Sequence, residues 1–342
     1  MSLVPDYIFM QNLYPVTSTC FFTVSSGDFL ITGDEKGIIK LWDLVSYKKT
    51  LLLEAHDTRI MSIQSDSDRK LILTQSRGEI KIWNYMETQP ATLELTKIYQ
   101  SSVVSLSNCC LLSMRTGNYL LACCSTSDSN IADLHHSDMD SVIPITSQSS
   151  NQFGLLMVMK LVYTKDPNQV VLLTGYESGI LKCDNIKLDI NEKIISVKDC
   201  HSLSLFNDMI TSIDFDSLSS KGVCGSVNSK LIIFTINDLD CEQFKINIVK
   251  SIDIGNEGIS SITIRPDYRL FCVSCWDSRV KLFSWKTFKL LAVLDKHKQS
   301  INSISFSKKL LNCSKMLLAI SSKDKTVSLW SPYSEKINIT SK

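Results

Sequence analysis

The hydrophobic and polar positions of the chain follow a short pattern that returns at regular intervals. In the segment Gly37-Ile38-Ile39-Lys40-Leu41-Trp42-Asp43, apolar residues occupy every second place after the glycine, and a large aromatic residue follows. Alternation with a period of two is typical of a β-strand with one buried face. The same frame begins again, with varying fidelity, at Gly78, Ser129, Gly179, Ser229, Ser278 and Lys325.

Further apolar strands are predicted before most of these frames. Runs such as Phe29-Leu30-Ile31-Thr32 precede them, and four units share an earlier apolar-x-Ser-Ile sequence, as in Ile60-Met61-Ser62-Ile63. Successive frames start 41 to 51 residues apart, near the roughly 40–50 residues of a four-stranded propeller blade. The pattern predicts an all-β, seven-bladed β-propeller that occupies residues 1–342 as a single domain. The expected blades span about 16–54, 56–99, 101–148, 153–200, 208–254, 258–296 and 299–333.

The two ends of the chain are expected to close the ring. The last unit, from Ile301 to about Pro332, supplies three strands, whereas the residues before Val16 belong to no blade. An unpaired strand edge is a liability that closed β-folds avoid. We therefore expect residues 1–14 to act as a latch, with Tyr7 to Gln11 as the outer strand of the seventh blade.

Composition and charge narrow the possible functions. Apolar residues make up 44% of the chain and charged residues 21%, which is enough for a core and a polar surface. The 36 Lys and Arg residues nearly balance the 35 Asp and Glu residues. Broad electrostatic binding to nucleic acid or to an acidic membrane is therefore not expected. The N-terminus shows no secretory signal, so the twelve cysteines are expected to be buried thiols in a reducing compartment.

Several segments resemble WD40 repeats. The strand ends Leu41-Trp42-Asp43, Ile82-Trp83-Asn84 and Leu329-Trp330-Ser331 carry this resemblance, together with the turn aspartates Asp277 and Asp324. A narrower resemblance, to the family of ASTRA-associated protein 1 (G-protein beta-subunit-like protein 1 in animals), covers about residues 16–333 and is weak over 100–150. The segments that carry it are Leu173–Gly179, Asp214–Ser217, Ile262–Asp267, Trp276–Trp285 and Ser322–Tyr333.

This resemblance implies a function without catalysis. Members of the family are non-enzymatic WD-repeat propellers. The implied role is that of a nuclear and cytoplasmic adaptor in the ASTRA assembly, which is linked to chromatin remodelling. It also implies association with the co-chaperone complex that matures the phosphatidylinositol 3-kinase-related kinases. Protein partners are expected. Binding to a cofactor, a membrane, nucleic acid or a small-molecule substrate is not expected.

His297, Ser322, Asp324 and Trp330 combine residue types that also occur in hydrolase sites. In the WD repeats that these segments resemble, the loop histidine, strand serine or threonine, turn aspartate and strand tryptophan form a buried hydrogen-bond chain. Such a chain satisfies polar groups inside a blade and fixes its conformation. We therefore expect these four residues to be structural.

The second unit carries a partial version of the same chain. It keeps His56, Thr74 and Trp83 but has Arg77 at the aspartate position. Its network is therefore expected to be structural and incomplete.

Two clusters invite interpretation as metal sites. The segment Cys272–Cys275 is a lone CxxC inside a strand pattern, and a zinc site needs about four ligands, so core packing is expected. His135, His136, Asp138 and Asp140 offer four ligands on a polar segment, where a solvated loop or divergent blade edge is the simpler interpretation. A zinc-dependent enzyme centred on these four residues is one alternative function.

A G-protein beta subunit is a second alternative. Such a subunit would need an N-terminal heptad helix of some 30 residues to hold its gamma partner. Only about 15 residues precede the first predicted blade, so this function is not expected.

The candidate partner site lies in the turns between the second and third strands. In a propeller these turns reach the narrow face around the channel, and an exposed tryptophan there is costly unless it packs or binds. Trp276 with Arg279, plus Tyr176 and Glu177, form the candidate patch. The alternative is that Trp276 folds over its own blade. The polar stretch 125–154 is expected to make the third blade irregular, as a partner-specific insertion or a tolerated loop.

Overall fold

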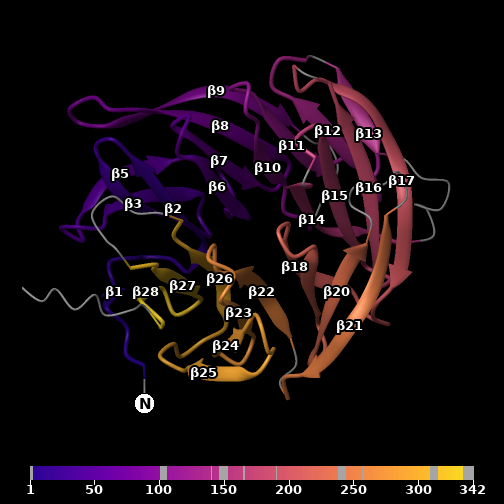
Figure 1. The fold of residues 1–342 in the computed structure, drawn as a ribbon. Helices are drawn as coiled ribbons and strands as arrows, with labels where there is room; N and C mark the ends of the chain where they lie inside the picture. The colour runs from indigo at the N-terminus through magenta and orange to yellow at the C-terminus, as the bar shows by residue number, and fades with distance from the viewer. Residues whose placement is uncertain are drawn as a thin grey trace, which may run out of the picture.

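The strands form seven four-stranded antiparallel sheets that follow one another around a central opening, as the colour sequence in Figure 1 shows. This computed structural model describes residues 3–100, 106–139, 141–145, 153–164, 166–189, 191–237, 244–255, 258–308 and 315–333. Within these ranges there is no helix, and hence none long and apolar enough to cross a membrane. The prediction of an all-β, seven-bladed propeller is confirmed.

Six sheets use four consecutive strands, and the seventh joins the two ends of the chain. The first three sheets are β2 (Val16–Val24), β3 (Gly27–Asp34), β4 (Ile38–Asp43) and β5 (Lys49–Glu54); β6 (Ser62–Asp66), β7 (Leu71–Ser76), β8 (Glu79–Met86) and β9 (Thr92–Gln100); and β10 (Cys110–Ser113), β11 (Tyr119–Cys124), β12 (Ala132–His136) and β13 (Val142–Ile145). The next three are β14 (Leu156–Tyr163), β15 (Gln169–Tyr176), β16 (Ile180–Leu188) and β17 (Ile194–Ser204); β18 (Ile210–Asp216), β19 (Lys221–Ser226), β20 (Lys230–Asn237) and β21 (Lys245–Asp253); and β22 (Ile259–Ile264), β23 (Leu270–Cys275), β24 (Val280–Ser284) and β25 (Leu290–Leu294). The last contains β26 (Ile301–Phe306), β27 (Leu318–Ser322), β28 (Val327–Trp330) and β1 (Tyr7–Phe9).

The apolar core is divided into layers between neighbouring blades. Between the first two blades, Ile31 and Leu41 lie in one buried cluster with Ile63, Ile72 and Trp83. A second strand such as β3 or β23 is buried at every residue, because it is covered by the blade on either side. Burial on both faces explains why these strands are continuous apolar runs, whereas the outer strands alternate.

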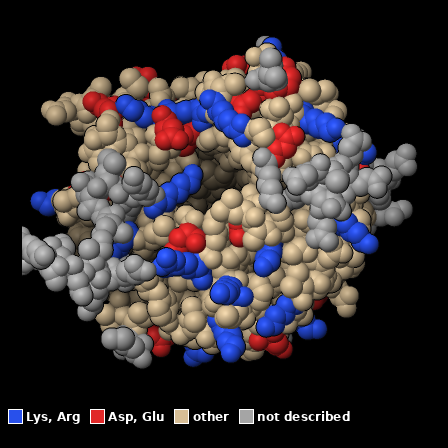
Figure 2. Space-filling view, viewed as in Figure 1, with Lys and Arg blue, Asp and Glu red and all other residues tan. Residues whose placement is uncertain are grey.

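Side chains on the inner strands tie each blade to its neighbour. Ser18 Oγ accepts a hydrogen bond from Ile63 N at 3.0 Å, and Ser212 Oγ accepts one from Ile262 N at 2.8 Å. Asn302 Nδ2 donates to Val16 O at 2.8 Å and so connects the last blade to the first. Figure 2 shows the hollow that remains at the centre of the ring, with side chains of both charge signs interspersed around it.

The N-terminal latch predicted from the sequence is confirmed, with a shorter strand. Strand β1 pairs with β28 in the register Tyr7↔Leu329 to Phe9↔Val327, rather than extending to Gln11. Phe9 is buried against Trp42 of the first blade, with ring centroids 4.9 Å apart. The latch therefore both completes the seventh sheet and packs against the first.

The third blade is predicted to be the irregular one, but its described strands do not single it out, because they pair without a register shift and the seventh blade contains a strand of only three residues. The first and last strands of the third blade, β10 and β13, have four residues each, whereas β14 and β17 of the next blade have eight and eleven. Within the polar stretch 125–154, residues 140 and 146–152 lie outside the described part of the chain. Its suggested role as a partner-specific insertion stays a prediction.

Candidate functional site

One face of the ring is formed by the turns between second and third strands and by the connections between blades; we call it the turn face. Backbone hydrogen bonds join the two sets of segments: Lys323 N donates to Ser300 O, and Ile60 N donates to Asp34 O, both at 3.0 Å. The turns that define this face comprise residues 35–37, 77–78, 125–131, 177–179, 227–229, 276–279 and 323–326.

Trp276 both packs on its own blade and stays accessible. Its indole covers Gly258 so closely that a Cβ atom at Gly258 would lie 2.1 Å from the ring. The side chain nevertheless keeps 53% of its surface exposed. Arg279, in the same turn, has a half-exposed side chain whose guanidinium lies 3.8 Å from the carboxylate of Asp277. Trp276 therefore folds over its own blade and also stays accessible beside the exposed Arg279, and the partner-binding role of these two residues stays a prediction.

The other two members of the predicted patch differ from each other. Glu177 is exposed in the turn of the fourth blade, two blades away from Trp276, and its carboxylate accepts a hydrogen bond from Leu155 N at 3.2 Å. Tyr176 was predicted to be a contact residue, and this is wrong, because its side chain is 2% exposed and packs against Phe153. It is the last residue of β15, and its side chain points into the core between blades.

The expected hydrogen-bond chain is present in the seventh blade, with one member changed. His297 Nδ1 lies 3.0 Å from Asp324 Oδ2, and His297 Nε2 lies 2.7 Å from Ser328 Oγ. Trp330 Nε1 donates to Ser328 Oγ at 2.8 Å. Ser322 was assigned to this chain wrongly: its hydroxyl donates to the carbonyl oxygens of Gln299 and Ser300 and so holds the connection between blades.

The network of the second blade is complete, which corrects the expectation drawn from Arg77. Glu79, two residues further along the chain, supplies the carboxylate, with its Oε1 2.5 Å from His56 Nδ1. His56 Nε2 and Trp83 Nε1 both reach Thr74 Oγ1 at 2.8 Å. The longer glutamate side chain therefore reaches the place that an aspartate in the turn would occupy.

A cross-strand exchange explains why the hydroxyl of the seventh blade comes from Ser328 and not from Ser322. In the second blade the hydroxyl comes from Thr74 on the second strand, which pairs directly with Lys81 on the third. In the seventh blade the equivalent pair is Ile320 and Ser328, so the third strand carries the hydroxyl. Directly paired residues lie about 5 Å apart, and either one can reach the tryptophan. The serine two places before a strand-ending tryptophan is the sequence signal that would have identified it.

The pKa values of Asp324, Glu79 and His56 are shifted within these networks. Burial alone would raise the pKa of Asp324, but hydrogen bonds from His297, Thr326 and the Lys298 amide hold it well below its usual range. Burial lowers the pKa of His56 and outweighs the opposing effect of Glu79. Such a closed and buried set of partners is a structural arrangement that fixes a blade.

Lowering the pH from 7.5 to 6 is expected to reduce the free energy of unfolding by about 1 kcal/mol. Burial depresses the pKa of both His56 and His135 in the folded state. The unfolded chain therefore takes up protons near pH 6.5 that the folded chain does not, and stability is lost as the pH falls. The buried Asp184, whose pKa is raised to about 6 by burial, takes up a proton in the folded chain as the pH approaches 6 and partly offsets this loss. Urea unfolding at the two pH values measures the difference.

The variant His135→Gln provides the control for this pH dependence. It removes one of the two depressed histidines, so about half of the loss should remain. Equal or greater stability of the wild type at pH 6 would contradict the assignment.

The histidine and aspartate cluster of the third blade does not converge on one point. His135 and His136 are successive residues of β12 and point to opposite faces of the sheet. His136 is buried, and its Nδ1 accepts a hydrogen bond from Asp138 N at 3.2 Å. Asp140 lies outside the described residues, and no group of three metal-binding side chains occurs among those described. Cys272 and Cys275 are buried free thiols of β23.

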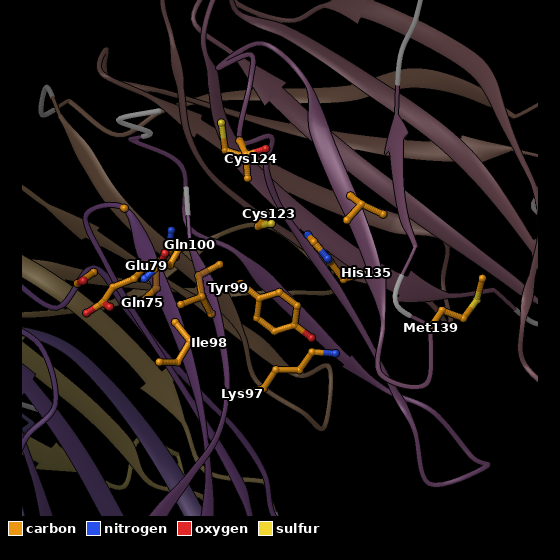
Figure 3. A pocket seen from close by; sticks show the side chains of 15 residues that line it. Gln75, Glu79, Lys97, Ile98, Tyr99, Gln100, Cys123, Cys124, His135 and Met139 are labelled. Atoms are coloured by element: carbon orange, nitrogen blue, oxygen red, sulfur yellow. The ribbon is translucent and has the colours of Figure 1, made fainter. Parts of the chain in front are cut away.

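A cleft of about 350 Å³ between the second and third blades was not predicted (Figure 3). Tyr99 of β9 and His135 of β12 meet edge to face at its wall, with centroids 4.8 Å apart. Lys97 lies over the Tyr99 ring, and Glu79 is engaged by His56. No unpartnered charge among these described residues specifies a ligand for the cleft.

Three segments, residues 47–84, 248–284 and 288–331, match the family described as WD domain, G-beta repeat. With the seven four-stranded sheets, this match defines the chain as a seven-bladed WD40 β-propeller. It is similar to the Cps50 (Swd1) β-propeller domain of Myceliophteria thermophila, with a TM-score of 0.71, 14% identity and 96% and 99% of the two chains covered. Similarity to Saccharomyces cerevisiae Sqt1 has a TM-score of 0.68 at the same identity and coverage. These likenesses concern the fold alone.

Curated relatives narrow the resemblance further. The chain is 25% identical over 306 residues to the guanine nucleotide-binding protein subunit beta-like protein 1 of Mus musculus, with 89% of this chain and 87% of the relative covered. It is 23% identical over 380 residues to the ASTRA-associated protein 1 of Schizosaccharomyces pombe, with 96% and 99% covered. The protein of that name from Verticillium alfalfae is 22% identical over 307 residues, with 83% and 74% covered. The resemblance to the ASTRA-associated protein 1 family is confirmed.

Proposed function

We propose that the chain is a non-catalytic scaffold subunit of a nuclear multiprotein assembly of the ASTRA type. In this role it binds ASTRA subunits and the co-chaperone complex that matures phosphatidylinositol 3-kinase-related kinases, in the nucleus and also in the cytoplasm. A WD40 propeller whose relatives are ASTRA-associated proteins supports a scaffold or adaptor role through protein–protein interaction. The names of these relatives support only an association with ASTRA. The co-chaperone complex and the kinases are proposed on the family resemblance described from the sequence.

The single observation that carries the binding role is the pair formed by Trp276 and Arg279. A tryptophan on a solvent-facing turn keeps apolar surface in contact with water, which is unfavourable unless a partner covers it. Trp276 remains half exposed even though it packs on Gly258. Tryptophan and arginine are the residue types most enriched among interface hot spots. The backbone bond from Trp276 N to Gly258 O, at 2.9 Å, fixes the turn before a partner binds, and pre-organisation lowers the cost of association.

The double variant Trp276→Ala/Arg279→Glu is expected to lose the co-chaperone subunits in affinity purification followed by mass spectrometry. Truncation of a hot-spot tryptophan typically costs 2 kcal/mol or more, so recovery should fall by about tenfold or more while the protein stays soluble. The matched control is Leu218→Ala/Lys286→Glu, which removes an exposed apolar residue and reverses a charge on the opposite face of the ring. This control should keep its partners.

Two outcomes would contradict these proposals separately. Unaltered partner recovery by the Trp276 and Arg279 variant would remove the patch and leave the scaffold function in place. Failure of the wild type to recover any ASTRA or co-chaperone subunit would remove the proposed assembly.

A further inference from the structure

A recess of about 600 Å³ opens where the turn face meets the channel, beside the first three blades. Arg59, from the connection between β5 and β6, and Arg77, from the turn between β7 and β8, both line it. Met61, Leu106 and Asn108 line it as well, together with Thr17, Thr58 and Asn302. The recess is separate from Trp276 and Arg279, which lie on the sixth blade.

The two guanidinium groups in this recess are not neutralised. Among the residues that the structure describes, neither Arg59 nor Arg77 forms a side-chain hydrogen bond or ion pair, and both are exposed. Two positive charges that line one recess repel each other. An anion between them is favoured because both guanidinium groups attract it and because it offsets their repulsion. Guanidinium groups bind carboxylates through paired hydrogen bonds of fixed geometry, which gives both strength and orientation.

Nearby carboxylates leave this positive charge in place. Glu79 is already engaged by His56 and Lys81. Asp57 lines the neighbouring hollow together with Arg77 but forms no ion pair with it within the described residues. Exposed lysines continue the positive charge over the adjoining turns and connections of the first and seventh blades, while Glu35 is an exposed carboxylate among them. These lysines are Lys36, Lys298, Lys323 and Lys325.

The apolar part of the recess restricts the ligand further. Leu106 is 62% exposed, and Met61 beside it is half buried. A simple anion would leave this surface in contact with water, whereas an apolar side chain next to the anionic group would cover it. Covering apolar surface contributes about 25 cal/mol for each Å² removed from water.

We propose that this recess binds an acidic segment of a protein partner, whose carboxylates pair with Arg59 and Arg77 and whose apolar side chain packs on Leu106 and Met61. Asn108 is exposed at the same wall and offers an amide donor to the segment. The inference rests on the proposed scaffold function but assigns a second contact site, with a stated partner chemistry, on different blades.

Fluorescence anisotropy with a fluorescein-labelled dodecapeptide of repeated Leu-Glu-Glu tests the proposal on the full-length protein. The double variant Arg59→Glu/Arg77→Glu is expected to weaken binding by about tenfold or more, because two charge-assisted contacts become repulsive. Leu106→Ala should weaken it several-fold. The matched control Lys286→Glu/Lys289→Glu reverses two exposed charges on the opposite face and should bind within about twofold of wild type. All variants should melt close to the wild type, since exposed substitutions change stability by about 0.5 kcal/mol or less.

Four results would overturn the proposal. Wild-type affinity of the Arg59 and Arg77 variant would show that the recess does not bind the peptide. Equal weakening of both double variants would show that binding is a general charge effect. Equal binding of a Leu-Gln-Gln peptide would remove the carboxylate requirement. Binding of a Leu-phosphoserine-phosphoserine peptide without binding of the glutamate peptide would reassign the recess to phosphate. If the peptide does not bind the recess but the wild type still recovers its partners, the scaffold function stands and only the recess proposal is removed. If the peptide binds the recess but the wild type recovers no partners, only the scaffold function is removed.

Discussion

Removal of residues 1–14 is expected to lower the melting temperature by several degrees. These residues include β1, which supplies the outer strand of the seventh sheet and pairs with β28 over three residues. Without β1, the edge of β28 loses its partners, and Trp42 in the first blade loses its contact with Phe9. The ring would then be held between its first and last blades mainly by the inner strands, through bonds such as that from Asn302 to Val16.

A single substitution sharpens this test. Phe9 is 2% exposed and packs on Trp42 and Tyr7, so Phe9→Ala should cost about 3–5 kcal/mol through lost burial and the cavity left behind. Met10 is the next residue and is 75% exposed, so Met10→Ala should change stability by about 0.5 kcal/mol or less. Thermal unfolding followed by circular dichroism compares the two variants and the truncated chain.

Two results would contradict the stabilising role of the latch. An unchanged melting temperature after truncation, or equal effects of Phe9→Ala and Met10→Ala, would show that the ring does not depend on β1. A loss confined to Phe9→Ala and the truncation would place the closing contact at the layer between the seventh and first blades.

Replacement of Gly37 by alanine is expected to cost about 3–5 kcal/mol in the free energy of unfolding. Gly37 has a φ of 80°, in the left-handed region, and a Cβ atom there would lie 1.9 Å from the carbonyl oxygen of His56. That oxygen belongs to the connection between the first two blades, whose amides at Ala55 and His56 donate to Gly37 O. The clash therefore displaces backbone that is held in place from two sides.

Gly117→Ala is the matched control for this prediction. Gly117 also has a positive φ, of 96°, but a Cβ atom there would meet nothing within 4 Å. Its substitution carries only the conformational cost of an alanine in the left-handed region, about 1–2 kcal/mol. Urea unfolding of both variants isolates the steric part. Equal losses in the two variants would contradict the close approach of the turn and the connection.

The repeated frame does not predict whether a side chain next to a turn is buried or exposed, as Tyr176 shows. Tyr176 and Trp276 both stand next to a turn between second and third strands, so the pattern gives them similar places. The structure buries the first and half exposes the second, because Tyr176 still belongs to β15 whereas Trp276 follows the end of β23. A shift of one residue along a strand reverses the face to which a side chain points.

The repeated frame also does not predict every member of the hydrogen-bond networks. His297, Asp324 and Trp330 are connected through a hydroxyl, as expected. Which hydroxyl and which carboxylate take part depends on cross-strand neighbours, as with Ser328 and Glu79. Residues paired across strands lie far from any fixed spacing in the chain.

The sequence by itself determined the class of fold, the number of blades and the existence of the latch. Each of these depends on local periodicity and on the repeated frame, since period-two alternation and unit length are properties of a linear pattern. The tertiary structure alone decided which turn residues are accessible, how the second blade completes its network, and that Arg59 and Arg77 line one recess. These features arise where separate segments meet at the junctions between blades, and the distance between two segments of a ring is fixed only when the ring closes.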